Sequence, residues 1–278
     1  MTEKPGLVVL DLDGTVVPYS TGVDEPSARV RDAIAGVIAA GIPVTVATGR
    51  AVWGALHGVH ALGMVTGGPL SVVCSNGAVL YDVVAGRVTH RVTIDPAPAV
   101  RALLEVNPRV GLAVEYGTEG YRYSGAFEPD FVSNFVGMVD VPTLISEPTV
   151  RLVCRLPGDD TDPAKYEGRR RAALDLVTIA NLAARGYSAE VGFSGWIDVA
   201  ARGVSKASGA AVVAATLGVD RSRVVAVGDG TNDLALFGWA GRSVAMGQAP
   251  ERVRAAADEV TGSVDDDGVA QLLERWLG

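Results

Sequence analysis

An apolar run at residues 7–10 ends abruptly in two carboxylates, and no other feature constrains the fold as strongly. Four consecutive apolar residues next to a glycine are typical of a short strand buried on both faces, as in a parallel sheet. Asp11 and Asp13 follow, with Leu12 between them. If the backbone stays extended, both carboxylates share one face and repel each other unless a cation lies between them or one is protonated. The pattern is typical of a catalytic site, although Asp and Gly also form simple polar turns.

Two further apolar runs end in small polar residues. The run at 43–47 ends in Thr48-Gly49-Arg50, and the run at 70–74 ends in Ser75-Asn76-Gly77. Segments with helical spacing separate these runs, which predicts a parallel α/β sheet with ligands at the C-terminal ends of its strands. Thr48 would then lie beside the Asp pair and offer a hydroxyl and backbone N–H groups to an anion. Asn76 fits either the rim of this site or a hairpin turn.

The same pattern returns in the C-terminal part of the chain. The run at 223–227 ends in a second acidic loop, Gly228-Asp229-Gly230-Thr231-Asn232-Asp233. Two acidic loops supply the oxygen ligands that a hard divalent cation needs, although each aspartate could instead cap the helix after it. Lys206, one of three lysines, stands where a strand gives way to a helix. A compact ammonium there suits an oxyanion, whereas a merely solvated lysine in a first helical turn would oppose the helix dipole.

The middle of the chain has a different character. Residues 87–192 contain short alternating segments and charged helical segments, without strands that end in carboxylates. We predict that they form an α+β domain inserted into an α/β domain made of residues 1–86 and 193–278. A strand at 196–199 would mark the return to the α/β domain. The expected fold class is therefore α/β, with a parallel-sheet core and an inserted α+β domain.

Composition limits the possible partners. With a net charge of −8 over 278 residues, the chain lacks the basic stripe of a general nucleic-acid binder, but a local cation can still meet a small anionic substrate. Cys74 and Cys154 lie in apolar runs, which favours buried free thiols in a reducing compartment. The N-terminus lacks the pattern of a signal peptide, and uncharged stretches fall short of the ~18 apolar residues that span a membrane. We expect a soluble cytoplasmic protein with neither nucleic-acid nor membrane partners.

Several motifs resemble those of one known family. The order of the four motifs of the haloacid dehalogenase (HAD) superfamily is followed by Asp11-x-Asp13-Gly14-Thr15, Thr48-Gly49-Arg50, Ser75-Asn76-Gly77-Ala78, Lys206 and residues 228–233. The match resembles the Cof-type phosphatase branch, which is also resembled by the later segments Val244-Ala245-Met246-Gly247 and Asp267-Gly268-Val269-Ala270. The insert lies where that branch carries a cap. The resemblance implies a Rossmann-like core with an inserted α+β cap, and an Mg²⁺-dependent phosphatase, monomeric or homodimeric, that acts on sugar phosphates or similar phosphomonoesters.

The resemblance also implies roles for single residues. Asp11 would attack phosphorus and form an aspartyl-phosphate, and Asp13 would act first as acid and then as base. The Mg²⁺ ligands would be Asp11, the backbone carbonyl of Asp13, Asp229 and Asp233, the last directly or through water. The phosphate-binding residues would be Thr48, Gly49 and Lys206, with Asn232 positioning Lys206 or its loop. Second-tier candidates are Thr15, Arg50 and Asn76.

Two other functions stay open at this point. A sugar phosphomutase is similar, because phosphomannomutases share the Asp pair and a related cap, but a mutase returns the phosphoryl group to the sugar. A non-catalytic protein that binds phosphorylated metabolites belongs to another class. It is less favoured, because a binding protein does not need Asp11 as well as Asp13.

Overall fold

The structure is a computed structural model that describes residues 4–18, 25–64, 71–127, 133–158, 165–192 and 194–277. Its chain divides into two compact units. The first unit comprises Met1–His90 and Ser205–Gly278, and the second unit comprises Arg91–Val204. Each unit has a buried apolar cluster of its own, so each is described by itself.

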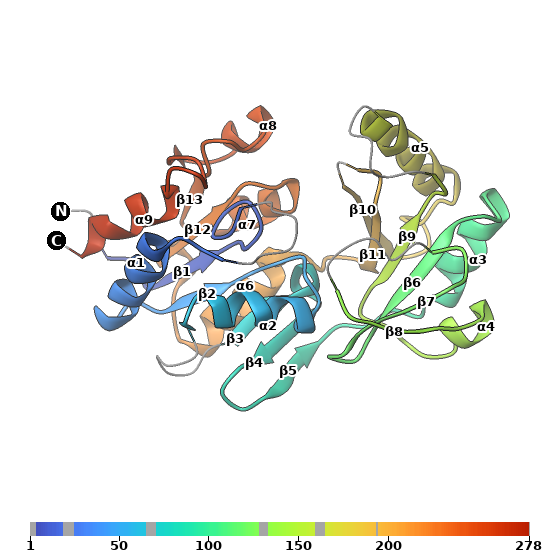
Figure 1. The fold of residues 1–278 in the computed structure, drawn as a ribbon, viewed down its shortest axis with the longest axis horizontal. Coiled ribbons are helices and arrows are strands. Elements are labelled where there is room, and N and C mark those ends of the chain that lie inside the picture. The colour runs from blue at the N-terminus through green and yellow to red at the C-terminus, as the bar shows by residue number, and fades with distance from the viewer. Residues whose placement is uncertain are drawn as a thin grey trace. The chain divides into compact units, whose positions relative to one another are not determined.

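A parallel sheet forms the centre of the first unit (Figure 1). The strand order is β14-β13-β12-β1-β2, and every pair is parallel. The strands are β1 (Leu7–Leu10), β2 (Val44–Val46), β12 (Val224–Gly228), β13 (Arg242–Ala245) and β14 (Glu259–Val260). All four residues of β1 are buried, as expected of a strand covered on both faces. The α/β class with a parallel core is therefore confirmed.

Helices cover both faces of this sheet. They are α1 (Ala28–Ala39), α2 (Val52–Ala61), α6 (Lys206–Thr216), α7 (Leu234–Trp239), α8 (Glu251–Arg254) and α9 (Gly268–Leu273). Leu7 and Val9 pack in one apolar cluster with residues of α6 and α7. The alternate strand residues point to the opposite face, and α1 and α9 pack against each other on the far side of β1 from α6 and α7 (Figure 1). Ser27 begins α1 by accepting a hydrogen bond from the Val30 N–H.

A three-stranded sheet, ordered β3-β4-β5, completes the first unit. Its strands are β3 (Ser71–Cys74), β4 (Val79–Asp82) and β5 (Arg87–Arg91). A parallel bridge between Ala47 and Val73 places β3 beside the end of β2. Because β3 and β4 are antiparallel, residues Ser75–Gly77 form the turn between them, as a short 3₁₀ segment.

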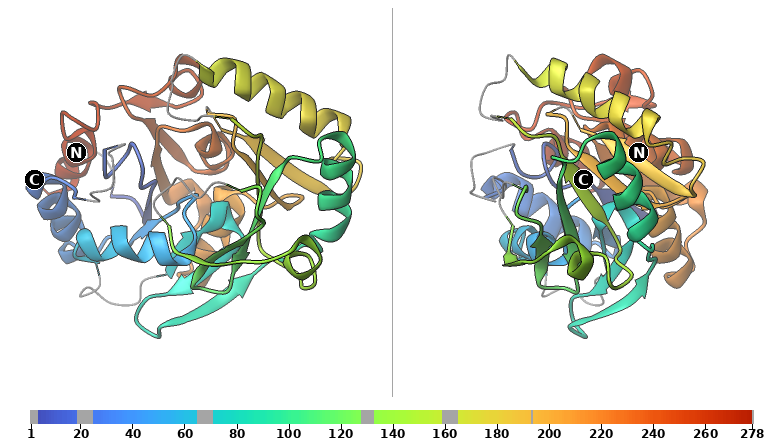
Figure 2. Two further views of the ribbon diagram at one scale, coloured as in Figure 1. Left: turned by 45° about the vertical axis from the view of Figure 1, so that its right-hand side comes forward. Right: turned by 90° about the vertical axis from the view of Figure 1, so that its right-hand side faces the viewer.

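The second unit is built on a six-stranded sheet ordered β10-β11-β9-β6-β7-β8. Its strands are β6 (Gly111–Tyr116), β7 (Gly120–Tyr123), β8 (Phe135–Met138), β9 (Leu152–Arg155), β10 (Tyr187–Val191) and β11 (Ile197–Ala201). Helices α3 (Ala97–Val106) and α5 (Tyr166–Ile179) lie on one face of this sheet (Figure 2), and α4 (Val141–Leu144) follows β8. No helix among the described residues is long and apolar enough to cross a membrane.

The units divide at positions different from those expected. The expected boundaries were 86/87 and 192/193, whereas the units divide after His90 and after Val204. The strand expected at 196–199 does not return to the parallel core: β11 pairs antiparallel with β9 and β10. Its burial alternates, with Asp198 half-buried between buried Ile197 and Val199, as in a strand with helices on one face only. Residue 193, the predicted start of the returning core, lies outside the described residues.

Candidate active site

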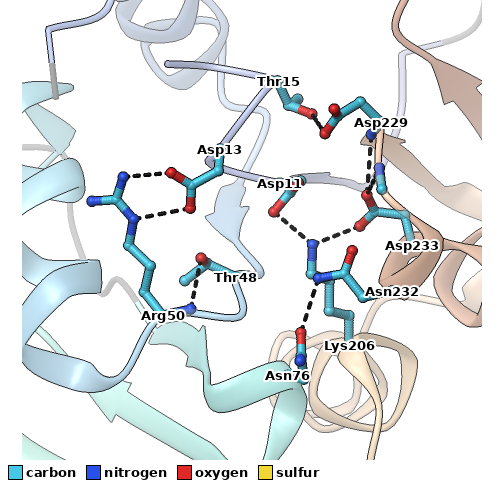
Figure 3. A network of polar contacts seen from close by, with 11 residues as sticks. Asp11, Asp13, Thr15, Thr48, Arg50, Asn76, Lys206, Asp229, Asn232 and Asp233 are labelled. Carbon is cyan, nitrogen blue, oxygen red and sulfur yellow. Dashed lines mark hydrogen bonds and ion pairs between the residues drawn. The ribbon is translucent and has the colours of Figure 1, made fainter. Parts of the chain in front are cut away.

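The two N-terminal aspartates face different cations. The strand β1 ends at Leu10, so the chain leaves the extended conformation before Asp13. The Asp11 carboxylate points toward Lys206, and the Asp13 carboxylate points toward Arg50 (Figure 3). The expected strand alternation does not extend to these residues, because β1 ends at Leu10, and each carboxylate is held by its own cation.

Lys206 is a fully buried cation between two carboxylates. It is the first residue of α6, a helix that Ser205 caps in a reciprocal capping box with Ser208. Its ammonium Nζ donates hydrogen bonds to Asp11 Oδ1 at 2.6 Å and to Asp233 Oδ1 at 2.7 Å, with no exposed side-chain surface. Burial alone would lower the pKa of Lys206, but the charges of Asp11 and Asp233 raise that pKa above its ordinary value. The lysine therefore stays charged between these two carboxylates.

The loop after β12 is folded around the Asp233 carboxylate. Asp233 Oδ2 accepts hydrogen bonds from the backbone N–H groups of Asp229 at 3.1 Å and Gly230 at 2.9 Å. A Cβ on Gly228 would lie 2.3 Å from Asp233 Cγ, so glycine is required where the strand meets this carboxylate. Because its other oxygen accepts from Lys206, Asp233 organises the loop and the lysine.

Three buried carboxylates form the group best suited to a metal ion in the described residues. Ligand oxygens of Asp11, Asp229 and Asp233 all lie within 4.8 Å of one another. The buried cluster holds three carboxylates and the one ammonium of Lys206, so acidic groups are in excess. Burial and the charges of Asp233 and Asp229 raise the pKa of Asp11, and Lys206 opposes this. An all-oxygen donor set with this excess of acidic groups fits a hard divalent cation such as Mg²⁺.

Thr15 is adjacent to this cluster. Its hydroxyl Oγ1 donates to Asp229 Oδ1 at 3.4 Å, which links the loop after β1 to the loop after β12. The two loops are also joined at the strand ends, where the Asp11 N–H donates to the Val227 carbonyl at 2.9 Å. Both acidic loops therefore meet at one edge of the parallel sheet, as the sequence pattern predicts.

The segment Thr48–Arg50 supplies the cation next to Asp13. Arg50 donates from Nη2 to Asp13 Oδ1 at 2.5 Å and from Nε to Oδ2 at 2.9 Å, so the guanidinium holds both carboxylate oxygens. The buried Thr48 hydroxyl Oγ1 accepts the Arg50 N–H at 3.1 Å and fixes the turn. Arg50, expected only as a second-tier residue, is thus the direct partner of Asp13.

The two asparagines of the site bond to each other. Asn232 Nδ2 donates to Asn76 Oδ1 at 3.0 Å (Figure 3). A Cβ on Gly49 would lie 3.2 Å from Asn76 Oδ1, so both side chains pack close to this glycine. The sequence left Asn76 as either turn or rim residue, and the structure makes it both.

One residue of the site was missed from the sequence. Gln248 follows β13, donates from Nε2 to the Gly14 carbonyl at 2.5 Å and accepts the Val264 N–H through Oε1 at 3.0 Å. It ties the loop after Asp13 to a loop near the C-terminus. Its position just after a parallel strand was the available signal, because such positions lie at the ligand-binding edge of the sheet.

The sequence is similar to a known protein family and to phosphatases over most of its length. It matches the model of a family described as haloacid dehalogenase-like hydrolase over residues 8–133 and 169–273. It is 27% identical to Phosphatase YwpJ of Bacillus subtilis, over 98% of this chain and 99% of that protein. It is 30% identical to a phosphoglycolate phosphatase of Natronomonas pharaonis, over 96% of each chain.

Solved structures give a similar result. A phosphatase of the haloalkanoate (HAD) enzyme superfamily from Bacteroides thetaiotaomicron superposes with a TM-score of 0.75 at 28% identity, over 98% of this chain and 95% of that one. A HAD subclass IIB sugar phosphatase superposes with a TM-score of 0.79 at 20% identity, over 97% of this chain and 98% of that one. At that identity, the second likeness shows the fold alone.

Proposed function

The chain belongs to the haloacid dehalogenase-like hydrolases, and on this premise we propose that it hydrolyses small phosphate monoesters with the help of Mg²⁺. The observation that carries the proposal is the buried Lys206 ammonium, held by Asp11 at 2.6 Å and Asp233 at 2.7 Å next to the third carboxylate, Asp229. Such a site combines a nucleophile, a fixed cation and a place for a divalent ion. These are the components that transfer of a phosphoryl group requires.

In the first proposed step, a carboxylate oxygen of Asp11 attacks phosphorus. The bond between phosphorus and the ester oxygen breaks, and Asp13 gives a proton to the departing oxygen. The product is an aspartyl-phosphate on Asp11. In the second step, a water molecule attacks this phosphorus, Asp13 takes the proton of the water, and inorganic phosphate leaves Asp11 free.

The contact between Arg50 and Asp13 changes during this proposed cycle. Both oxygens of Asp13 accept hydrogen bonds from Arg50, at 2.5 and 2.9 Å. A proton on one of these oxygens makes that oxygen a weaker acceptor for Arg50. We infer that the Arg50 contact weakens when Asp13 carries the proton and strengthens again when Asp13 is a carboxylate.

A bound Mg²⁺, Lys206 and the Thr48–Gly49 loop would together hold the phosphoryl group. Asp11, Asp229 and the backbone carbonyl of Asp13 would bind Mg²⁺. Asp233 would bind a water ligand of the metal and also hold Lys206 in place. The metal neutralises charge on the transferring phosphoryl oxygens. The Thr48 and Gly49 loop and Lys206 would orient the same oxygens.

The relatives favour hydrolysis over the other two functions considered. Those named above are phosphatases, which does not favour the return of the phosphoryl group to a sugar. We propose sugar phosphates and phosphates of short acids as the substrate class; the second of these is supported by the relative that is a phosphoglycolate phosphatase. We further propose that the second unit acts as the cap that selects the leaving group.

A direct assay tests the function. The purified protein should release phosphate from p-nitrophenyl phosphate with Mg²⁺, lose this activity in EDTA and regain it when Mg²⁺ is restored. Asp11→Asn should remain folded and lose turnover by roughly three orders of magnitude or more. Asp220→Asn is the matched control, since Asp220 is exposed and only caps a short 3₁₀ segment, where asparagine caps equally well. Retained activity in Asp11→Asn would rule out the aspartyl-phosphate route.

A further inference from the structure

The turn between β3 and β4 has an unusual backbone. Ser75 and Asn76 both have a φ of 52°, and Gly77 follows with a φ of 99°. Non-glycine residues resist this left-handed region, asparagine least and serine more. Elsewhere in the described residues only Asn181 and Asp267 share it among non-glycines. Such strain persists only where the surrounding structure fixes it, and it is concentrated at functional sites.

The turn is fixed through its main chain by two site loops. The Ser75 N–H donates to the Arg50 carbonyl at 2.8 Å, and the Asn76 N–H donates to the Thr48 carbonyl at 3.0 Å. A Cβ on Gly77 would lie 1.9 Å from the carbonyl oxygen of Ser205, the residue that caps the helix beginning at Lys206. The strained turn therefore touches both loops that would hold the phosphoryl oxygens.

The side chain of Asn76 contacts a third loop of the site. Its Oδ1 accepts from Asn232 Nδ2 at 3.0 Å, and Asn232 lies in the acidic loop between Asp229 and Asp233. The main-chain bonds to Thr48 and Arg50 hold the turn in place, and from this turn the Asn76 side chain reaches Asn232. A single short turn thus connects three segments that are far apart in the sequence.

We propose that Asn76 is a positioning residue that keeps the Thr48, Lys206 and Asn232 segments in register around the phosphoryl group. This inference rests on the proposed phosphatase function. Asn76 acts through the hydrogen bond that its side chain accepts from Asn232. Because phosphoryl transfer depends on positioning, a small displacement of these groups lowers the rate about a hundredfold.

Two substitutions separate the side chain from the backbone. Asn76→Gly removes the amide but adopts the left-handed backbone without strain, so it should fold. Asn76→Ala removes the same amide and resists that backbone, so it should melt at a lower temperature than Asn76→Gly. Both should lose kcat/KM by about tenfold to a hundredfold, and by the same factor. A loss of activity that follows melting temperature would instead indicate a purely structural role and overturn the proposal.

Asn181→Gly is the matched control. Asn181 is exposed, has a φ of 50° and lies in the second unit, so the same substitution is made at the same backbone conformation outside the site. It should leave kcat and KM at their original values. Asn232→Ala and the double variant Asn76→Gly/Asn232→Ala complete a cycle: if Asn76 acts through Asn232, the double variant falls little below Asn232→Ala. Losses that multiply would contradict the proposal.

Binding of inorganic phosphate distinguishes this inference from the function on which it rests. Calorimetry with phosphate and Mg²⁺ should show weaker binding in Asn76→Gly and Asn76→Ala, and unchanged binding in Asn181→Gly. If the wild-type protein hydrolyses no ester but binds phosphate, the proposed function fails while this comparison still decides the role of Asn76. If the wild-type enzyme is active and Asn76→Gly matches it in turnover and phosphate binding, only the inference fails.

Discussion

At the scale of single residues, the site is organised by buried charge. Lys206 is the largest side chain among those fully buried in the described residues. A buried ammonium is tolerated only when it is paired, and Asp11 and Asp233 pair with it. Asp229 brings a third carboxylate close to this pair, and we propose that a divalent cation binds where the three carboxylates meet.

Asp229 tests the metal site. Asp229→Asn should raise the Mg²⁺ concentration for half-maximal activity at least about tenfold, because one anionic ligand is lost. In EDTA the variant should melt no lower than the wild-type protein, because the change removes one of three repelling carboxylates. Mg²⁺ titrations of activity and melting curves in EDTA measure both effects. Asp220→Asn serves as control, and an unchanged Mg²⁺ requirement in Asp229→Asn would exclude this carboxylate as a ligand.

Site residues could be predicted from the sequence where they lie directly at the end of a strand or the start of a helix. Asp11, Asp229 and Lys206 were expected from the sequence because carboxylates and a rare lysine follow apolar runs or precede a helix. The pairing of Arg50 with Asp13 and of Asn232 with Asn76 depends on which loops meet in space. Gln248 was missed because its position after a strand indicates the edge of the sheet but not the loops that its side chain joins.

At the scale of elements, the parallel sheet brings the site together. Strands β2, β1, β12 and β13 are neighbours, so the loops at their C-terminal ends share one edge. This was predictable, because buried runs alternating with helices favour only a parallel arrangement. The strand β11 was assigned to the wrong sheet, because one short alternating segment fits the edge of an α/β core as well as an antiparallel sheet.

Helix α6 must pack closely on β3 to place Lys206. A Cβ on Gly209 would lie 2.3 Å from Val73 Cγ1 and 3.1 Å from Gly77 Cα. Gly209→Ala should therefore push the helix outward, lower the free energy of unfolding by about 1–3 kcal/mol and reduce kcat/KM. Gly168→Ala in α5 is the control with the opposite sign: no atom lies near its Cβ position, so alanine should stabilise by up to about 1 kcal/mol. Denaturant unfolding measures the change in the free energy of unfolding for both variants. Equal changes at the two positions would contradict the packing argument.

The junction of β13 and β14 gives a pH-dependent prediction. Asp258 Oδ2 accepts from the Ser243 N–H and hydroxyl, both at 2.8 Å, and these bonds lower the pKa of Asp258. A carboxyl whose pKa is lower in the folded state stabilises the fold above its unfolded pKa, and this contribution is lost as the pH falls through the folded pKa. Asp258→Asn should therefore cost about 1 kcal/mol at neutral pH, and the cost should shrink below pH ~4.

The free energy of unfolding of Asp258→Asn and of the wild-type protein, measured at neutral pH and below pH ~4, checks this expectation. Asp32→Asn, exposed on α1, is a suitable control and should change the free energy of unfolding by less than about 0.5 kcal/mol at either pH. A cost in Asp258→Asn that is independent of pH would show that the charge of this carboxylate does not contribute.

At the scale of the whole molecule, the chain consists of two units with separate apolar clusters. The insertion of an α+β segment was predictable from the break in strand pattern. Its boundaries were not, because β5 and β11 are short strands at the points where the chain passes between the units. We expect the two units to unfold in separable transitions.

Arg151 tests this separation. It is buried in the second unit, with contacts of 3.2 Å to both Glu115 and Asp198 and a hydrogen bond to Tyr121 Oη. Arg151→Met leaves two carboxylates without their cation and should destabilise the second unit by about 3–5 kcal/mol. Calorimetry should show one transition falling while the other stays in place. Arg171→Met, at an exposed position of α5, should move neither, and a single transition that shifts as a whole would contradict the division.

The central claim is that Asp11 carries the phosphoryl group during turnover. A rapid acid quench, with enzyme in excess over a small ester labelled in its phosphoryl group, tests this most directly. We predict that label remains on the protein, is released by neutral hydroxylamine as expected of an acyl phosphate, and is absent from Asp11→Asn. Turnover without label on the protein, or equal labelling of Asp11→Asn, would contradict the claim.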